Sequence, residues 1–211
     1  MTQLDVRIDA AGCVLAGTYA EVPNPVAAAL LITGSGQTDR NSDARLPGGR
    51  KLRAGITQAV AEAVDAVRVC TLRFDKRGVG ASGGDYLKVG MDQRAADARD
   101  WLAAKTEGLA ERLPTTTKLT DPAQVLARIT VPVLAITGAH DLQVPPEDVA
   151  AMSRLVRGPF EGHVVPDLSH LLRPDPGSLG PRGYRQQTRQ PVSPVVLQLI
   201  TTWLCRNWGQ A

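Results

Sequence analysis

The stretch LRFDKRGVGASGG, residues 72–84, decides how the whole chain is interpreted. It continues the apolar run VRVCT, which predicts a buried strand that ends near Phe74, where charged residues and glycine begin. Residues 80–84, GASGG, satisfy Gly-x-Ser-x-Gly, a pattern that can surround a nucleophilic serine lying directly between a strand and a helix. Ser82 has charged residues and glycine before it and GGDYLKVG after it, so neither flank fits that role. The favoured interpretation of Ser82 is therefore a structural turn.

The residues before this stretch predict strands and a helix in alternation. LDVRIDA and CVLAGTYAEV have period-2 character around Ala11-Gly12 and predict an antiparallel hairpin. VAAALLITGSG predicts a buried strand that ends in glycines, and apolar residues near helical spacing predict a helix over 50–67. Strand, helix and strand in this order predict a parallel sheet with helices on its faces.

The second half continues the alternation. Helices are predicted over 91–105, 145–158 and 193–208, and a short helix is predicted from Thr120 or Asp121, with Pro122 at its first position. VPVLAITGAHD predicts a buried strand and GHVVPDLSH a final strand and loop. Residues 111–120 and 173–191 are predicted to be irregular.

Three stretches resemble the α/β-hydrolase superfamily, most closely its bacterial acyl-hydrolase and serine-aminopeptidase-like branch. They are LLITGSGQTDRN, LRFDKRGVGASGG and ITVPVLAITGAHDLQVPPEDVAAM, and with the later DLSH the resemblance runs in order from about residue 5 to 211. It implies an α/β fold, a mostly parallel sheet with helices on both faces and an N-terminal antiparallel hairpin. We expect a single domain over residues 1–211.

The resemblance implies an acid and a base at two positions. Asp141 follows VLAITGAH at the carboxyl end of a strand, where it would orient a catalytic histidine, and the alternative is a carboxylate that caps the next turn. His170 comes 29 residues later (170 − 141) and would be the base, the alternative being a structural or exposed histidine. His140 and His163 are weaker candidates for the base.

The loop after the strand at 26–36 has a further implied role. By resemblance Gly34, Ser35, Gly36 and Gln37 lie on the oxyanion side, where glycines let backbone N–H groups approach a developing charge. A tight turn needs the same glycines, so both interpretations stay open. No Gly-Lys-Ser/Thr follows, which disfavours nucleotide binding.

The resembled family contains a strand and a nucleophile elbow that this sequence lacks. In the family the segment around Ser82 is a turn one strand before the elbow, and no other serine has the required setting: Ser35, Ser42, Ser153, Ser169, Ser178 and Ser193. The resemblance therefore implies that the elbow, its flanking strands and the lid are deleted. Loss of these central strands leaves three outcomes: the two halves pair directly, a homodimer shares strands, or the exposed edges aggregate.

The composition of the chain is typical of a globular protein. The chain has 211 residues, 43% hydrophobic content and a net charge of +3, and no apolar run approaches the roughly 18 residues of a membrane span. We expect a cytoplasmic protein with no nucleic-acid or membrane partner, and with Cys13, Cys70 and Cys205 as reduced thiols.

By resemblance the function is hydrolysis of an ester, thioester or amide through a serine acyl-enzyme, without metal or organic cofactor. The partner would be a small acyl ester or amide, as substrate or as ligand. Whether the chain is an enzyme stays open. It retains hydrolase activity with Ser82 or an activated water in place of the lost serine, or it is a non-catalytic derivative that binds an acyl ligand or a partner protein, or it is a truncated product. Loss of a nucleophile costs many orders of magnitude in kcat, which favours little or no activity.

Overall fold

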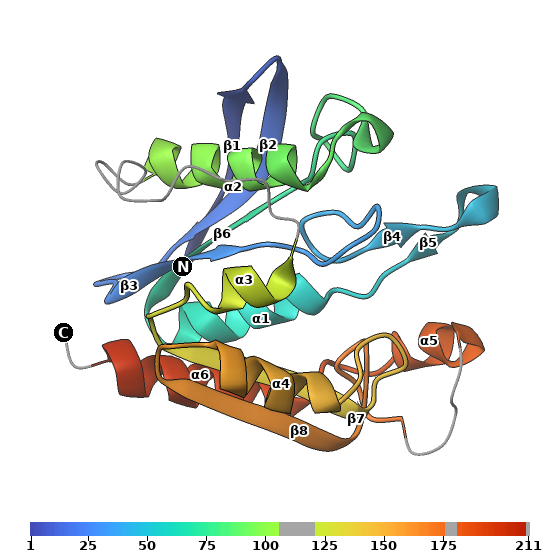
Figure 1. The fold of residues 1–211 in the computed structure, drawn as a ribbon. Helices are drawn as coiled ribbons and strands as arrows, with labels where there is room; N and C mark the ends of the chain where they lie inside the picture. The colour runs from blue at the N-terminus through green and yellow to red at the C-terminus, as the bar shows by residue number, and fades with distance from the viewer. Residues whose placement is uncertain (106–120, 176–180, 210–211) are drawn as a thin grey trace. The chain divides into compact units, whose positions relative to one another are not determined.

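The computed structural model describes residues 1–105, 121–175 and 181–209 (Figure 1). They form two compact units, unit 1 (Met1–Leu119) and unit 2 (Thr120–Gln210), and each unit is described by itself. The expectation of a single domain over 1–211 stays a prediction. No helix in these three ranges is long and apolar enough to cross a membrane.

The predicted N-terminal hairpin is confirmed. Strand β1 (Thr2–Ala10) pairs antiparallel with β2 (Cys13–Glu21) along its whole length. Its turn is Ala11-Gly12, where both residues have positive φ, 30° and 86°. Glycine adopts this left-handed conformation without strain, which explains why the chain reverses there.

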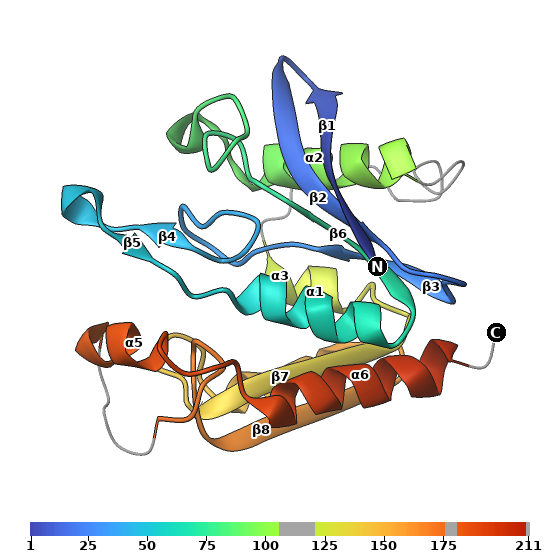
Figure 2. The ribbon, with the colours of Figure 1, turned by 180° about the vertical axis from the view of Figure 1, so that it is seen from behind.

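The hairpin continues into a four-stranded sheet with the order β1-β2-β6-β3. Strand β6 (Val69–Phe74) runs antiparallel to β2 and parallel to β3 (Ala27–Leu31). Every residue of β6 is buried, as the apolar run predicted. Helices α1 (Ile56–Ala66) and α2 (Met91–Lys105) lie on opposite sides of β6 (Figures 1 and 2).

Two very short strands and two 3-10 turns of the structure were not predicted from the sequence. Strands β4 (Ala44–Arg45) and β5 (Lys51–Leu52) form a small hairpin around the 3-10 turn η1 (Pro47–Gly49). A second 3-10 turn, η2, covers Tyr86–Lys88. Helix α1 begins later than the predicted residue 50 because residues 51–52 pair in β5.

The core of unit 1 gathers around Trp101 of α2, which is fully buried. Its ring lies 5.8 Å from the ring of Phe74, and Leu15 and Leu72 belong to the same cluster. A Cβ at position 17 would lie 2.9 Å from the Trp101 ring. Gly17 of β2 therefore allows the indole to approach the sheet.

Unit 2 is built on two parallel strands, β7 (Val133–His140) and β8 (Phe160–Ser169). Helices α4 (Glu147–Leu155) and α6 (Pro194–Trp208) cover opposite faces of this pair (Figures 1 and 2). The apolar side chains of β8 and α6 meet in a small cluster that contains Val165, Leu168 and Val196. Both strands and both helices match the sequence prediction.

Two shorter helices complete unit 2. Helix α3 (Pro122–Leu126) begins as predicted, since the Asp121 carboxylate caps it by accepting from the N–H of Ala123 at 2.9 Å. Helix α5 (Pro181–Gln187) lies where an irregular segment was predicted, so that part of the prediction is wrong. The predicted irregular segment 111–120 lies outside the described residues.

The strands of the two units belong to separate sheets. Within the described residues β3 pairs only with β6, and β7 pairs only with β8. The direct pairing of two sheet halves, one of the expected outcomes, stays a prediction. The parallel pairs β3/β6 and β7/β8, the hairpin and the flanking helices together confirm the predicted α/β class.

Candidate functional site

The turn that follows β6 is organised by the carboxylate of Asp75, which is 2% exposed. Its Oδ1 accepts from the backbone N–H of Arg40 at 2.7 Å, and its Oδ2 accepts from the Arg40 guanidinium at 2.9 Å and from the N–H of Ala81 at 2.8 Å. Gly80 has a φ of 59°, and a Cβ there would contact this carboxylate. The glycine and the aspartate thus fix the turn together.

Ser82 is tied to the same turn by both functions of its hydroxyl. Its Oγ donates to the carbonyl of Asp75 at 2.7 Å and accepts from the N–H of Ala16 in β2 at 2.9 Å. The next residue, Gly83, donates its N–H to the carbonyl of Val14 at 2.9 Å. These bonds attach the turn to the edge of the hairpin.

Arg77 connects the turn to α2 through a buried ion pair. Its guanidinium lies 2.7 Å from the carboxylate of Asp97, and the two side chains are 7% and 2% exposed. The guanidinium also donates to the carbonyls of Ala10 and Ala11 at 2.8 and 3.1 Å. Hydrogen bonding to Asp97 raises the pKa of Arg77. This pair stabilises the fold and leaves no free carboxylate at Asp97.

Lys76 holds the loop that contains Gly34–Gln37. Its Nζ donates to the carbonyls of Gly34 and Gly36, both at 2.7 Å, and to the hydroxyl of Thr38 at 3.0 Å. Burial, followed by the nearby charge of Arg94, lowers the pKa of Lys76 to about 8. An ammonium has three donors, so these acceptors use all of them.

The loop itself is exposed from Gly34 to Gln37. Among the residues that the structure describes, the backbone N–H groups of these four residues have no acceptor. Free donors at the end of a strand can bind an oxygen of a ligand. The geometry is thus compatible with both interpretations of the loop, a tight turn and an oxyanion-side loop.

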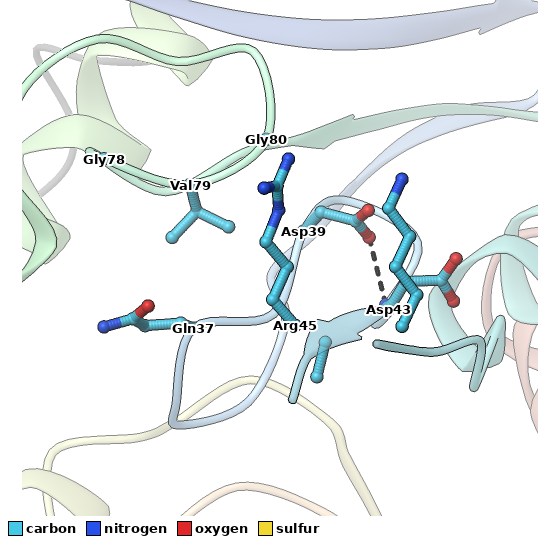
Figure 3. Close-up of a pocket in the computed structure, with 9 residues that line it drawn as sticks. Gln37, Asp39, Asp43, Arg45, Gly78, Val79 and Gly80 are labelled. Atoms are coloured by element: carbon cyan, nitrogen blue, oxygen red, sulfur yellow. Dashed lines mark hydrogen bonds between the residues drawn. The ribbon is translucent and has the colours of Figure 1, made fainter. Parts of the chain in front are cut away.

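A polar cavity of about 410 Å³ lies next to this loop (Figure 3). Asp39 and Asp43 contribute carboxylates, and Arg45 extends its guanidinium toward Gly80. Both carboxylates are engaged with the backbone: Asp39 accepts from the N–H of Asp43 at 3.0 Å, and Asp43 accepts from Gly55 at 3.0 Å. Burial, together with the charge of Asp39, raises the pKa of Asp43. The carboxylates therefore shape the loop.

In unit 2 the structure brings Asp141 and His170 together. The Nδ1 of His170 lies 2.9 Å from Oδ2 and 3.1 Å from Oδ1 of Asp141. Asp141 follows β7, His170 follows β8, and because the two strands are parallel their carboxyl ends share one edge. The side chain of Asp141 is 7% exposed and that of His170 is 34% exposed, so the carboxylate is buried while part of the imidazole reaches solvent.

Asp141 also caps the turn that follows it. Its Oδ1 accepts from the N–H groups of Gln143 at 2.8 Å and Val144 at 3.0 Å. The geometry of Asp141 is thus compatible with both alternatives, a carboxylate that orients a histidine and a carboxylate that caps the next turn. Hydrogen bonds from the turn fix the carboxylate, and the fixed carboxylate orients the Nδ1 side of the imidazole.

The other two histidines are engaged elsewhere. The Nδ1 of His140 lies 2.6 Å from the carbonyl of Asp175. His163 pairs with Glu161 at 2.8 Å, and its hydrogen bond lowers the pKa of that carboxyl group. Neither contacts Asp141 through a hydrogen bond that the structure records, so His170 is the histidine positioned by the buried carboxylate.

A buried polar network supports the loop of His170. The hydroxyl of Ser169 donates to Oε1 of Gln187 at 2.6 Å, and the amide nitrogen of Gln187 donates to Asp175 at 2.6 Å. Gln187, Lys76 and Asp97 were not among the residues predicted from the sequence. A signal existed for Lys76, because charged residues directly after a buried strand need partners. No such signal marked Gln187.

The predicted site residues therefore form two groups. Asp141 and His170 form a pair in unit 2, whereas Ser82 and the Gly34–Gln37 loop belong to unit 1. Within the described ranges no group of three His, Cys, Asp or Glu side chains could hold a metal ion. The expectation that no metal or cofactor is needed stays a prediction.

Neither the protein-family models nor the curated proteins compared with this sequence match it. Solved structures do match. Est1E from Butyrivibrio proteoclasticus with bound ferulic acid has a TM-score of 0.65 at 14% identity, over 97% of this chain and 100% of that one. A predicted CIB-like hydrolase from Thermoplasma acidophilum has a TM-score of 0.64 at 13% identity, over 98% and 99%.

A third match is XC6422 from Xanthomonas campestris, described as an a/b serine hydrolase without lid. Its TM-score is 0.56 at 15% identity, over 99% of this chain and 96% of that one. Sequence identities this low indicate a shared fold but do not indicate a shared activity. The strand order, the parallel pairs and these neighbours agree with the resemblance found in the sequence, and the chain has the α/β-hydrolase fold.

Proposed function

We propose that this protein is a slow hydrolase of activated acyl bonds, in which His170 is the general base and Asp141 orients it. The observation that carries the proposal is the 2.9 Å contact between Nδ1 of His170 and the buried carboxylate of Asp141. A histidine fixed on its Nδ1 side by a carboxylate keeps Nε2 available to accept a proton.

The chemical step uses water in place of a serine. Nε2 of His170 accepts a proton from water while the water oxygen bonds to the acyl carbon. The tetrahedral adduct collapses as the bond to the leaving group breaks, and His170 returns the proton to the departing oxygen, sulfur or nitrogen. Asp141 remains a carboxylate and stabilises the imidazolium that forms in between. Without a covalent intermediate the reaction is slow, so activated esters are the suitable substrates.

Ser82 has a positioning role in this proposal. Both hydrogen bonds of its hydroxyl connect backbone groups of the turn and of β2. For the Gly34–Gln37 loop we propose that its free N–H groups donate to an oxygen of a bound acyl group. A small acyl ester or amide is the partner, and the cytoplasm is the proposed compartment.

Hydrolysis of p-nitrophenyl acetate by purified variants tests the proposal. Since general base catalysis contributes roughly 10²-fold or more, His170→Gln should lower the rate above background by about that factor. Asp141→Asn should lower it as well, because the amide no longer stabilises the imidazolium. His163→Gln is the matched control and should hydrolyse like the wild type, since the described structure pairs His163 with Glu161 and records no hydrogen bond from it to Asp141 or His170. Equal rates for the wild type and His170→Gln would show that the proposal is wrong.

The second candidate is a non-catalytic protein that binds an acyl ligand or a partner protein. The observation in its favour is that the Ser82 hydroxyl is engaged by two backbone groups, the carbonyl of Asp75 and the N–H of Ala16. A fluorophosphonate probe read by intact mass tests both candidates against a mechanism with Ser82 as nucleophile. We expect no adduct on Ser82, whereas an adduct that Ser82→Ala abolishes would restore a serine mechanism.

A further inference from the structure

A second cavity of unit 1, of about 240 Å³, combines apolar walls with positive charge. Ile32, Phe74 and Met91 supply apolar surface, and Lys76 and Arg94 supply the charge. Ile32 and Met91 are 61% and 65% exposed, which is unusual for large apolar side chains beside a cavity. The cavity therefore has room and surface for an apolar group.

The two cations have no anionic partner in the part of the chain that is described. Lys76 donates only to two carbonyls and a hydroxyl, all of them neutral. Arg94 makes no ion pair there, and its Nε is buried without an acceptor. Both charges face the ring of Tyr86, with Arg94 at 4.4 Å and Lys76 at 6.0 Å from the ring centroid. The charge of Arg94 also lowers the pKa of Lys76, so the two like charges repel each other.

Nearby carboxylates do not neutralise them. Asp97 also lines the cavity, but its oxygens accept from Arg77, with the shortest contact at 2.7 Å. Asp39 attracts Lys76 without forming an ion pair with it. Burial of a cation without a counter-charge costs free energy, and the lowered pKa of Lys76 reflects this cost. An anion in the cavity would offset it.

We propose that this cavity binds a small monocarboxylate with an apolar body. The carboxylate would lie at Arg94, whose planar guanidinium suits two oxygens, in the field of Lys76. The apolar body would lie against Ile32, Phe74 and Met91. The backbone N–H groups of the adjoining loop supply further donors, since the loop lines the cavity. The proposal uses residues of unit 1 alone and does not rest on the proposed hydrolysis.

Isothermal titration of the full chain with three probes tests the proposal. Hexanoate has both features, hexanamide has the apolar body without the charge, and acetate has the charge without the body. We expect hexanoate to bind at least tenfold more tightly than either. Equal binding of hexanoate and hexanamide, equal binding of hexanoate and acetate, or no heat of binding at millimolar hexanoate would each overturn it.

Variants locate the site. Arg94→Gln keeps a planar polar group without the charge and should weaken hexanoate binding at least tenfold, while Arg94→Lys should recover part of the affinity. Arg45→Gln is the matched control, because Arg45 lines the other cavity, and it should bind hexanoate like the wild type. Circular dichroism melts verify that each variant is folded. Unchanged binding by a folded Arg94→Gln protein would place hexanoate elsewhere and refute the proposal.

Discussion

Ser82 donates one hydrogen bond to the carbonyl of Asp75 and accepts another from the N–H of Ala16. Ser82→Ala leaves both backbone groups without this partner. We expect the free energy of unfolding to fall by about 1–3 kcal/mol, the range for a lost buried partner, while hydrolysis of p-nitrophenyl acetate is unchanged. Urea denaturation and the hydrolysis assay measure the two quantities.

Ser35→Ala is the matched control for stability. Ser35 is exposed, and its hydroxyl has no partner among the described residues, so its removal should change the free energy of unfolding by less than about 0.5 kcal/mol. A folded Ser82→Ala protein that has lost hydrolysis would contradict the structural role.

Lys76 predicts a specific dependence of stability on pH. Its pKa is about 8 in the folded chain against an ordinary 10.5. Between these values the unfolded chain holds a proton that the folded chain has lost, so the free energy of unfolding rises with pH. Urea denaturation from pH 8 to 9.5 measures the slope. That range ends below pH 10, where Tyr19, whose pKa is raised to about 12, begins to act in the opposite direction.

The comparison variant is Lys76→Met, which lacks the titrating group. It also lacks the three hydrogen bonds of the ammonium, and its slope should lack the contribution of Lys76. Equal slopes for the two proteins would show that the pKa of Lys76 is ordinary.

Elements with a strong apolar pattern could be predicted from the sequence. The hairpin, β6 and α2 follow from alternation, an apolar run and helical spacing, and all three are present. Strands β4 and β5 have two residues each, too few for any periodicity. Helix α5 lies in a segment rich in glycine and proline, and Gln187 at its end is fixed by Ser169 and Asp175, which are remote in sequence.

The candidate site was predictable only in part, because some of its contacts join segments that are remote in sequence. Asp141 and His170 each follow a predicted parallel strand, so their proximity could be expected. The bonds from Lys76 to the Gly34–Gln37 loop and from Arg77 to Asp97 depend on how distant segments pack. The spacing of residues in a single sequence does not show which distant side chains will become partners. The catalytic roles themselves remain predictions.

The turn after β6 makes a prediction about backbone geometry. Gly80 has a φ of 59°, and a Cβ there would contact the carboxylate of Asp75. Gly80→Ala should lower the free energy of unfolding by at least about 1–3 kcal/mol, the range for backbone strain, because the clash with Asp75 adds to that strain. Gly83→Ala in the same turn is the control, because its nearest neighbour would be the Val14 carbonyl oxygen at 3.5 Å, an ordinary contact. Thermal denaturation of both variants compares them, and equal melting temperatures would contradict this account.

The whole chain consists of two compact units, while the sequence predicts one domain. If that prediction holds, calorimetry will show one transition whose van't Hoff and calorimetric enthalpies agree. Two transitions would mean that the units unfold independently and would refute it. A broad, non-cooperative melt would favour a truncated product.

The oligomeric state of the chain can be tested in the same way. Within the described residues β3 and β7 each pair on one side only, and unpaired strand edges favour association. Sedimentation velocity separates the predicted possibilities, a closed monomer and a strand-sharing homodimer, by mass.

Trp101, packed against Gly17 and Phe74, also serves as an intrinsic fluorescent probe. Its ring is fully buried, and in the described residues its Nε1 has no hydrogen-bond partner, so its fluorescence should lie at short wavelength and shift to the red when unit 1 opens. The other two tryptophans, Trp203 and Trp208, lie in α6 with ring centroids 5.1 Å apart. A Trp101→Phe chain would report on unit 2 alone, and the difference between its emission and that of the unchanged chain would report on unit 1.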